Sequence, residues 1–469
     1  MNELMMDAAR RGVRYVESLR TRKVYPSSEA LERLHELDLP LQDESIDPFE
    51  VLEILDTIGS PATVASASGR YFGFVIGGSL PVALAANMLA AAWDQNAAIY
   101  VSSPIGSVLE EVCRKWLLSL FGLPTESGVG FTSGATMANF TCLASARHAV
   151  LRDAGWDVES QGLFGAPPVT VVVGEEAHAS IFKAISLLGM GRERAVRVRA
   201  DDQGRMRVDS FPSICGPTIV CVQVGNVNTG AFDPVKEICA IAKDHEAWVH
   251  VDGAFGLWAA ASPERTHLVS GIEEADSWTT DAHKWLNVPY DSGVAIVRNP
   301  ADLGTAMSMS AAYHIETGKR DPWDYVPQIS RRARGVEIWA ALRSLGRTGL
   351  ADLIERSCKH AARFAEELTA AGYRVLNDVV LNQVLVSFGD EETTNRVISR
   401  IQEDGTCWCG GTVWQGQAVM RISVSCWATT EEDVERSLSA ILQIAAEEVK
   451  FPFLKGASSH ANKPSPRGS

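Results

Sequence analysis

An aspartate and a lysine in the middle of the chain are residue types that can do chemistry together. Asp252 ends the strand-like apolar run 247–251, and Lys284 follows it inside the stretch 280–286. A lysine amine can hold an aldehyde as an imine, and a carboxylate can keep a pyridine nitrogen protonated so that the ring takes up electrons. Pyridoxal 5'-phosphate needs these two groups. The order of strand, aspartate, second apolar stretch and lysine therefore predicts that cofactor.

Five short motifs surround these residues. They are FTSGATMAN (131–139), AHAS (177–180), NTGAFDP (228–234), WVHVDGA (248–254) and TDAHKWL (280–286). In this order they resemble the group II pyridoxal-phosphate-dependent amino-acid decarboxylases, the family of the aromatic-amino-acid, glutamate and histidine decarboxylases. The resemblance runs from about Arg70 to about Glu435. It implies a fold-type I, aspartate-aminotransferase-like α/β chain, with a mostly parallel seven-stranded sheet in a large domain and a smaller C-terminal α/β domain.

The resemblance also implies roles around the cofactor ring. Lys284 is the expected imine-forming amine, and Asp252 is expected to face the ring nitrogen. His178 follows a predicted strand, and the resemblance makes it the imidazole that stacks on the ring and orients the substrate carboxylate. Ala254 lies two positions after Asp252 on the same strand face, and it is expected to pack against the other face of the ring.

The phosphate of the cofactor is expected at the turn 133–136. Small residues let backbone amides approach an anion, and the helix that follows presents its positive end. The resemblance assigns phosphate contacts to Ala135 and Thr136, with His283 as a further contact. Asn226 stands where many relatives carry a threonine near the cofactor, so we expect a changed contact there.

Candidate substrate contacts come from two other segments. Arg421 lies in the apolar run 419–425, where an arginine needs an anion partner. That partner is either a structural carboxylate or, as the resemblance implies, the α-carboxylate of the substrate. Phe72 belongs to a group of aromatic residues that line an apolar substrate pocket or pack in the core. The group comprises Tyr71, Phe72, Trp93 and Tyr100.

A proton donor is also needed, because Cα must be protonated once carbon dioxide has left. In this family the acid is a tyrosine on a mobile loop ahead of a basic segment. Tyr313 occupies the matching place before the basic run 331–334, and Tyr325 is the alternative. The polar, turn-prone stretch 318–322 suits a flexible loop.

These residues must be positioned by an α/β framework. Apolar β-branched runs at 169–173, 218–222 and 247–251 predict buried parallel strands, whose carboxyl ends carry ligand-binding loops. We expect five parts, in the following order. They are an N-terminal helical segment at a dimer interface (1–60), a large cofactor-binding domain (61–305), a mobile catalytic loop with a connecting helix (306–345), a small C-terminal α/β domain (346–455) and a disordered tail (456–469).

Composition narrows the class of protein. The chain has 469 residues, a formal charge of −15 and nine cysteines without metal-ligand spacing. Its acidity argues against nucleic acid or an anionic membrane as the main partner. Unpaired cysteines and an acidic N-terminus without a long apolar core predict a cytoplasmic protein with no secretory signal or membrane anchor. The resemblance adds a homodimer with shared active sites.

The predicted activity is the decarboxylation of an L-amino acid to its amine. A lyase or aldolase that breaks the Cα–Cβ bond needs the same lysine, aspartate and histidine, so it is the main alternative, followed by an aminotransferase. A non-catalytic binding protein would not need to keep the three together. Asp252-Gly253-Ala254-Phe255 departs from the Asp-Ala-Ala-Tyr common among relatives, which leaves the reaction and the substrate open.

Overall fold

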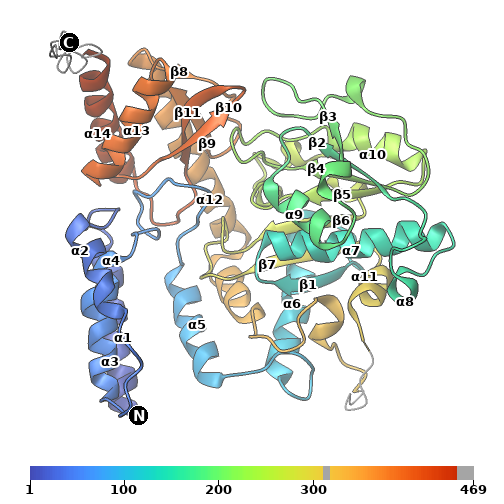
Figure 1. Ribbon diagram of the computed structural model, residues 1–469, viewed down its shortest axis with the longest axis horizontal. Helices are drawn as coiled ribbons and strands as arrows, with labels where there is room; N and C mark the ends of the chain where they lie inside the picture. The colour runs from blue at the N-terminus through green and yellow to red at the C-terminus, as the bar shows by residue number, and fades with distance from the viewer. Residues whose placement is uncertain (310–316, 451–469) are drawn as a thin grey trace, which may run out of the picture.

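The computed structural model describes residues 1–309 and 317–450. It consists of an N-terminal helical arm, a large domain built on a seven-stranded sheet, and a smaller domain built on a four-stranded sheet (Figure 1). The segment of Tyr313 and the predicted tail 456–469 lie outside the described residues.

The large sheet has the strand order β1-β7-β6-β5-β4-β2-β3. Its strands are β1 (Gly128–Thr132), β2 (Thr170–Gly174), β3 (Val196–Val198), β4 (Thr218–Gln223), β5 (Trp248–Asp252), β6 (Ser277–Asp281) and β7 (Gly293–Val297). β7 is antiparallel to both of its neighbours, and the pairs from β6 to β3 are parallel. The predicted mostly parallel sheet is confirmed. β2, β4 and β5 are the three apolar β-branched runs, as strands buried on both faces require.

Helices cover both faces of this sheet. One face packs against α7 (Ala135–Asp153), α9 (Ala179–Leu187) and α11 (Pro300–Met307). The other packs against α6 (Pro104–Phe121), α10 (Val235–Lys243) and the first part of α12 (Gly335–Ala370). The result is a three-layer arrangement in which the carboxyl ends of β2, β4 and β5 open at one edge.

The long helix α12, which leads to the smaller domain, has a kink. Gly346 interrupts α12 with φ of 61° and ψ of −173°, a conformation that favours glycine. Leu353 and Ile354, after the kink, still pack in the core of the large sheet, so the boundary at residue 346 stays a prediction. The antiparallel sheet has the order β10-β11-β9-β8, and its elements are β8 (Arg374–Val375), β9 (Gln383–Ser387), α13 (Glu391–Asp404), β10 (Gly410–Trp414), β11 (Gln417–Ser423) and α14 (Glu431–Lys450).

The N-terminal arm is helical, as predicted for 1–60. It contains α1 (Asn2–Ser18), α2 (Ser28–Glu32), a 3₁₀ turn (Arg33–Leu37), α3 (Pro48–Ile54), a π-helical turn (Leu55–Gly59) and α4 (Ser60–Ala62), and α5 (Pro81–Trp93) follows. Arg11 and Arg14 tie α1 to Asp56 at 3.1 Å. Within the described chain no residue of α1 is buried, and no described helix is long and apolar enough to cross a bilayer.

Candidate active site

The loops that follow β2, β4, β5 and β6 carry the predicted cofactor residues to one edge of the sheet. His178 follows β2, Asn226 follows β4, Ala254 follows β5 and Lys284 follows β6. The pKa of the His178 imidazole is lowered by burial and is also shifted by the charges of three other predicted residues, which are Asp252, Lys284 and Arg421. Residues far apart in sequence therefore lie at one edge of the sheet.

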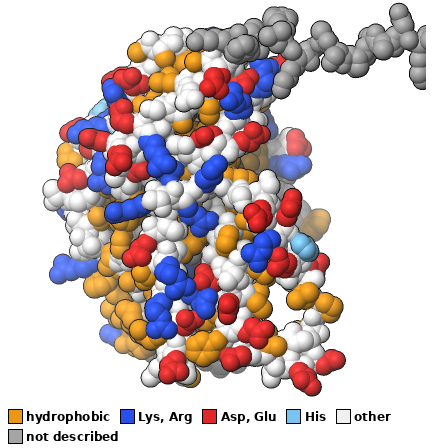
Figure 2. All heavy atoms as spheres, turned by 90° about the vertical axis from the view of Figure 1, so that its left-hand side faces the viewer, with side chains coloured by type: hydrophobic (Ala, Val, Ile, Leu, Met, Phe, Trp, Pro, Cys, Tyr) orange, Lys and Arg blue, Asp and Glu red, His pale blue; other side chains and the backbone are white. Residues whose placement is uncertain are grey.

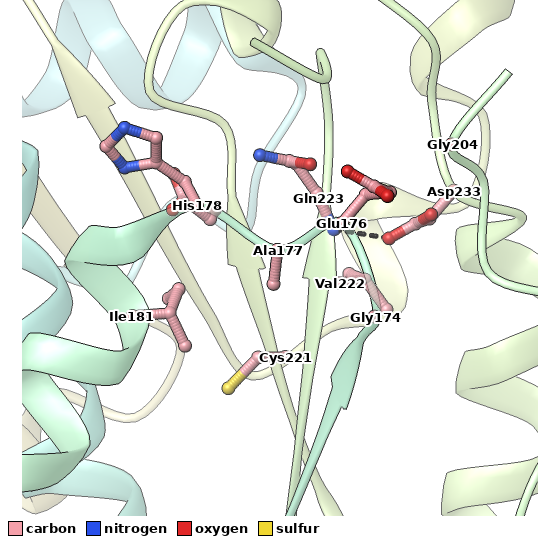
Figure 3. Close-up of a pocket in the computed structure, with 11 residues that line it drawn as sticks. Gly174, Glu176, Ala177, His178, Ile181, Gly204, Cys221, Val222, Gln223 and Asp233 are labelled. Carbon is pink, nitrogen blue, oxygen red and sulfur yellow. Dashed lines mark hydrogen bonds between the residues drawn. The ribbon is translucent and has the colours of Figure 1, made fainter. Parts of the chain in front are cut away.

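Figure 3 shows part of this edge. The polar side chains of His178, Gln223 and Glu176 lie on one side of the strand ends, whereas Ile181 and Cys221 point to the opposite side. A small cavity of about 10 Å³ lies beside them and reaches Asp252 and Asp233. Burial raises the pKa of Asp233 to about 7. Its carboxylate accepts the backbone amides of Gln223 and Met206 at 2.6 and 2.7 Å, so it fastens a neighbouring loop to the end of β4.

Lys284 is paired with Asp281, which the family resemblance also offered, with Thr280, as a less certain contact of the phosphate. Its Nζ lies 3.0 Å from Oδ2 of Asp281, the last residue of β6. The other oxygen of Asp281 accepts the backbone amide of Ala135 at 2.6 Å. Asp281 thus links the lysine to the start of α7.

The start of α7 is built to hold an anion. A Cβ on Gly134 would lie 3.1 Å from Cε1 of His283, and a Cβ on Gly293 would lie 2.5 Å from the Cα of Gly134. Glycines at these two positions therefore let the helix terminus, β7 and the histidine come together. The Ala135 amide already binds a carboxylate, and Thr136 is partly accessible. The positive end of a helix at this place favours an anion such as the phosphate of pyridoxal phosphate.

Asp252 is buried and held at both carboxylate oxygens. Nδ2 of Asn139 donates to Oδ2 at 3.1 Å, and the amide of Ala254 donates to Oδ1 at 3.2 Å. A carboxylate fixed by two donors at the end of a strand is suited to accept a further proton-bearing group, such as a protonated ring nitrogen. Asn139 was missed by the sequence reasoning, although it closes the motif 131–139.

The His178 side chain is exposed toward the site, and its ring is held in place by contacts with Ser180. Its Nδ1 lies 2.8 Å from Oγ of Ser180 and accepts the Ser180 amide at 3.2 Å. Desolvation by the surrounding protein lowers the pKa of His178. The charge of Asp252 opposes this effect, and those of Lys284 and Arg421 add to it. The ring is therefore neutral near pH 7 and carries its proton on Nε2.

Arg421 lies on β11 with its guanidinium partly accessible. Its Nη1 donates to Oδ1 of Asn228 at 3.0 Å, and burial lowers the pKa of Arg421 to about 10. Across residues 1–309 and 317–450 we find no carboxylate paired with it. A structural ion pair, one of the two roles considered for this residue, is therefore absent from the described part of the chain.

The structure contradicts one predicted contact, that of Phe72 with the substrate, and the contact of Asn226 with the cofactor stays a prediction. Phe72 is fully buried and packs edge-on against Phe364, with ring centroids 5.1 Å apart, in the core of the smaller domain. The expected substrate contact is therefore corrected to a packing role, because the sequence could not show which domain this ring joins. Asn226 bonds the amides of Asn228 and Thr229 and so closes its own loop.

The two tyrosine candidates differ in what can be said of them. Tyr313 lies outside the described residues, and its role stays a prediction. Tyr325 is partly buried against the core beneath α7 and α11. The guanidinium carbon of Arg320 lies 3.8 Å from the centroid of its ring.

Comparison with known proteins gives a consistent result. The family model described as the pyridoxal-dependent decarboxylase conserved domain matches residues 29–389. An aromatic-L-amino-acid decarboxylase of Bacillus atrophaeus is 25% identical over 441 residues, covering 88% of each chain. An L-2,4-diaminobutyrate decarboxylase of Rhizobium meliloti (strain 1021) is 31% identical over 386 residues, covering 78% of this chain and 75% of the relative.

The fold agrees with these matches. The crystal structure of Oryza sativa TDC with PLP and tryptamine superimposes with a TM-score of 0.87 at 22% identity, covering 95% of this chain and 97% of that one. These relatives favour a carboxy-lyase over the aldolase and aminotransferase alternatives. The chain belongs to the pyridoxal-dependent decarboxylase family and is an amino-acid decarboxylase that uses pyridoxal phosphate.

Proposed function

We propose that this enzyme removes the α-carboxylate of an L-amino acid and releases carbon dioxide and the corresponding amine. The observation that carries the proposal is Arg421. Its guanidinium is desolvated and, among the described residues, is hydrogen-bonded by an amide oxygen and by no carboxylate, so it is prepared to bind one. Burial lowers the pKa of His178, the charge of Arg421 lowers it further, and the charges of Lys284 and Asp252 also shift this pKa. A carboxylate bound to Arg421 would therefore lie at the cofactor.

The residues of the site suit the cofactor. When bound, pyridoxal phosphate supplies an electron-accepting ring next to Cα of the substrate. Lys284 would hold it, with Asp252 facing its ring nitrogen. Its phosphate would be bound at the start of α7 by Ala135 and Thr136, with His283 alongside. Ala254 and His178 are both accessible from the site, and they would pack on opposite faces of the ring.

The substrate carboxylate would be oriented by two groups. Arg421 supplies a charged pair, and the Nε2–H of His178 supplies a neutral donor, because its Nδ1 is already an acceptor. Fixing the carboxylate selects which bond on Cα lies perpendicular to the ring plane, and that bond is the one that breaks. Proton delivery to Cα by Tyr313, or by Tyr325, stays a prediction from the family resemblance.

We also propose that the chain works as a homodimer. Helix α5 is apolar on all sides except at Asn87, yet Ala83 is its one buried residue among those described. Met88, Leu89 and Trp93 are 53%, 56% and 43% exposed. A helix that is apolar all round is normally buried, and an exposed patch of this kind marks an interface.

The arm adds to this surface. In Figure 2, hydrophobic side chains interrupt the charged surface in the lower half of the picture, where Figure 1 places the N-terminal helices. The exposed apolar residues of α1 and α3 are Met5, Met6, Val13, Val16, Phe49 and Val51. A second copy of this chain would cover both the arm and α5. All nine cysteines lie in the described part and none forms a disulfide, which is compatible with the predicted cytoplasmic location.

The activity can be tested with a panel of L-amino acids that includes aromatic, acidic and basic side chains. We expect the wild-type enzyme, loaded with pyridoxal phosphate, to release carbon dioxide from at least one of them. Lys284→Ala should abolish release, whereas Lys359→Ala, which changes an exposed lysine of α12, should leave it unchanged. Release that persists in Lys284→Ala would contradict the proposal.

A further inference from the structure

One face of β5 is polar although the strand is completely buried. Trp248, His250 and Asp252 alternate along it and face α7, whereas Val249 and Val251 face the opposite layer. α7 packs directly on β5 and β6 (Figure 1). A strand in this position is normally apolar on both faces. Burying these polar groups costs folding free energy unless each of them forms a hydrogen bond.

The partners form one continuous chain of hydrogen bonds. Nδ2 of Asn139 contacts Asp252 at 3.1 Å and Oγ of Ser180 at 3.2 Å. Oδ1 of Asn139 contacts Nε2 of His250 at 2.9 Å. Nδ1 of His250 and the indole nitrogen of Trp248 each lie 2.9 Å from Oγ of Ser277, the first residue of β6.

The direction of every bond follows from the Asp252 carboxylate. Because its oxygens can only accept, the amide nitrogen of Asn139 faces it and the amide oxygen faces His250. His250 must then donate from Nε2 and accept at Nδ1 from the Ser277 hydroxyl. That hydroxyl oxygen is free to accept the indole N–H of Trp248. Burial holds the pKa of His250 down at about 3, so the ring stays neutral and keeps this orientation.

The same asparagine also reaches His178. The second hydrogen of its Nδ2 goes to Ser180, whose hydroxyl can then donate to Nδ1 of His178. The Ser180 backbone amide also donates to this Nδ1, so the proton of His178 lies on Nε2. One buried side chain thus connects the group expected at the ring nitrogen with the group expected on the ring face.

We propose that Asn139, held in one orientation by His250 and Ser277, is a positioning residue that fixes Asp252 and the Ser180 hydroxyl beside His178 before the cofactor binds. The proposal deepens the site described above, and it rests on the proposed role of Asp252 at the ring nitrogen. His250 and Ser277 touch neither cofactor nor substrate. They act through Asn139.

A pair of variants at position 250 separates this role from simple packing. His250→Gln keeps a donor at the place of Nε2, whereas His250→Met has similar length and no donor. Each apoprotein is titrated with pyridoxal 5'-phosphate and with its 1-deaza analogue, in which a C–H group replaces the ring nitrogen. Affinities are read from protein fluorescence, so the test does not depend on turnover.

We expect His250→Met to weaken binding of the natural cofactor at least fivefold and binding of the analogue less than twofold. His250→Gln should stay within twofold of the wild type for both. Equal weakening of the two ligands by His250→Met would show a packing role only, and no weakening of either would also overturn the proposal. So would a His250→Gln protein that behaves like His250→Met.

Ser277→Ala provides a second test, and it removes only a hydroxyl group. If His250→Met does not fold, this variant still tests the proposal. Without that donor, Nδ1 of His250 no longer has a fixed role, and the Asn139 amide can turn over. We expect at least threefold weaker binding of the natural cofactor, with the analogue again within twofold. Loss of decarboxylation with unchanged binding of both ligands would overturn the positioning role and leave the proposed reaction untouched. If instead the binding pattern is as expected but the wild-type enzyme releases no carbon dioxide from any amino acid of the panel, the proposed reaction is wrong and the positioning role of Asn139 stands.

Discussion

The carboxyl edge of the large sheet and the surface of α5 differ in how their unusual side chains are satisfied. At the sheet edge, the buried polar groups of Asn139, His250 and Asp252 all find hydrogen-bond partners within the chain. On α5, Met88 and Leu89 remain more than half exposed to solvent across the described structure. The hydrogen-bond network behind Asp252 is therefore satisfied within the described chain, whereas the apolar surface of α5 is the part that the proposed dimer would cover.

Among changes at the sheet edge, we expect a substitution of Asp252 to reduce the decarboxylation rate most. Asp252→Asn removes the charge expected to keep the ring nitrogen protonated, which should slow decarboxylation by roughly two to four orders of magnitude, or several kcal/mol of barrier. Steady-state kinetics of the loaded enzyme would measure the change. Activity within about threefold of the wild type would show that another group holds the ring nitrogen.

Arg421 provides the next largest change at the same edge. Arg421→Gln should raise KM by about one to two orders of magnitude, because a charge-assisted pair to the substrate is lost. Arg421→Lys should recover part of this loss, since it restores the charge without the two-pronged geometry. Measured cofactor affinity should be the same in all three proteins. A change in cofactor affinity without a change in KM would place Arg421 at the cofactor instead.

On the α5 side, one charge should separate the proposed subunits. Leu89→Glu buries a carboxylate in any interface that covers the helix, and we expect the dimer dissociation constant to rise at least tenfold, by about 1.4 kcal/mol or more. Val413→Glu is the matched control, because Val413 is an apolar residue of β10 that is 68% exposed. Sedimentation over a range of concentrations would measure both. Equal behaviour of the two variants would remove α5 from the interface.

The two regions also differ in how far the sequence predicted them. The strands β2, β4 and β5 and the positions of His178, Asp252 and Lys284 follow from local apolar runs and from motif order. The partners of these residues do not. Asn139 lies on a helix and His250 on a strand, and only the packing of α7 over β5 brings them together.

The corrected and unforeseen features have the same origin. Phe72 looks like a pocket aromatic in the sequence, but the chain carries it into the core of the smaller domain against Phe364. The exposed apolar surface of α5 was also not predicted, since the sequence of a fully apolar helix normally indicates a buried one. Both features depend on how distant parts of the chain pack together, and that packing leaves no local signal.

The smallest expected effect concerns pH and the buried ring of His250. Its pKa is about 3 in the folded protein and near the ordinary 6.5 when unfolded, so the unfolded chain binds an extra proton between these values. The stability that this group contributes is complete above about pH 6.5 and is lost as pH falls toward 3. Between pH 7 and 4 the wild type should lose more stability in urea than His250→Gln, by at most about 3 kcal/mol. His245→Gln, at an exposed histidine, should match the wild type, and identical pH profiles for all three would show that His250 is charged in the fold or not buried.

The most direct test of the assigned chemistry is a product balance from one accepted L-amino acid in heavy water. Loss of the α-carboxylate followed by protonation of Cα predicts equal amounts of carbon dioxide and amine, with one deuterium at the former Cα. The measurement requires trapped gas and mass spectrometry of the amine from the same sample. An α-keto acid without carbon dioxide, or an aldehyde derived from the substrate side chain, would contradict the account.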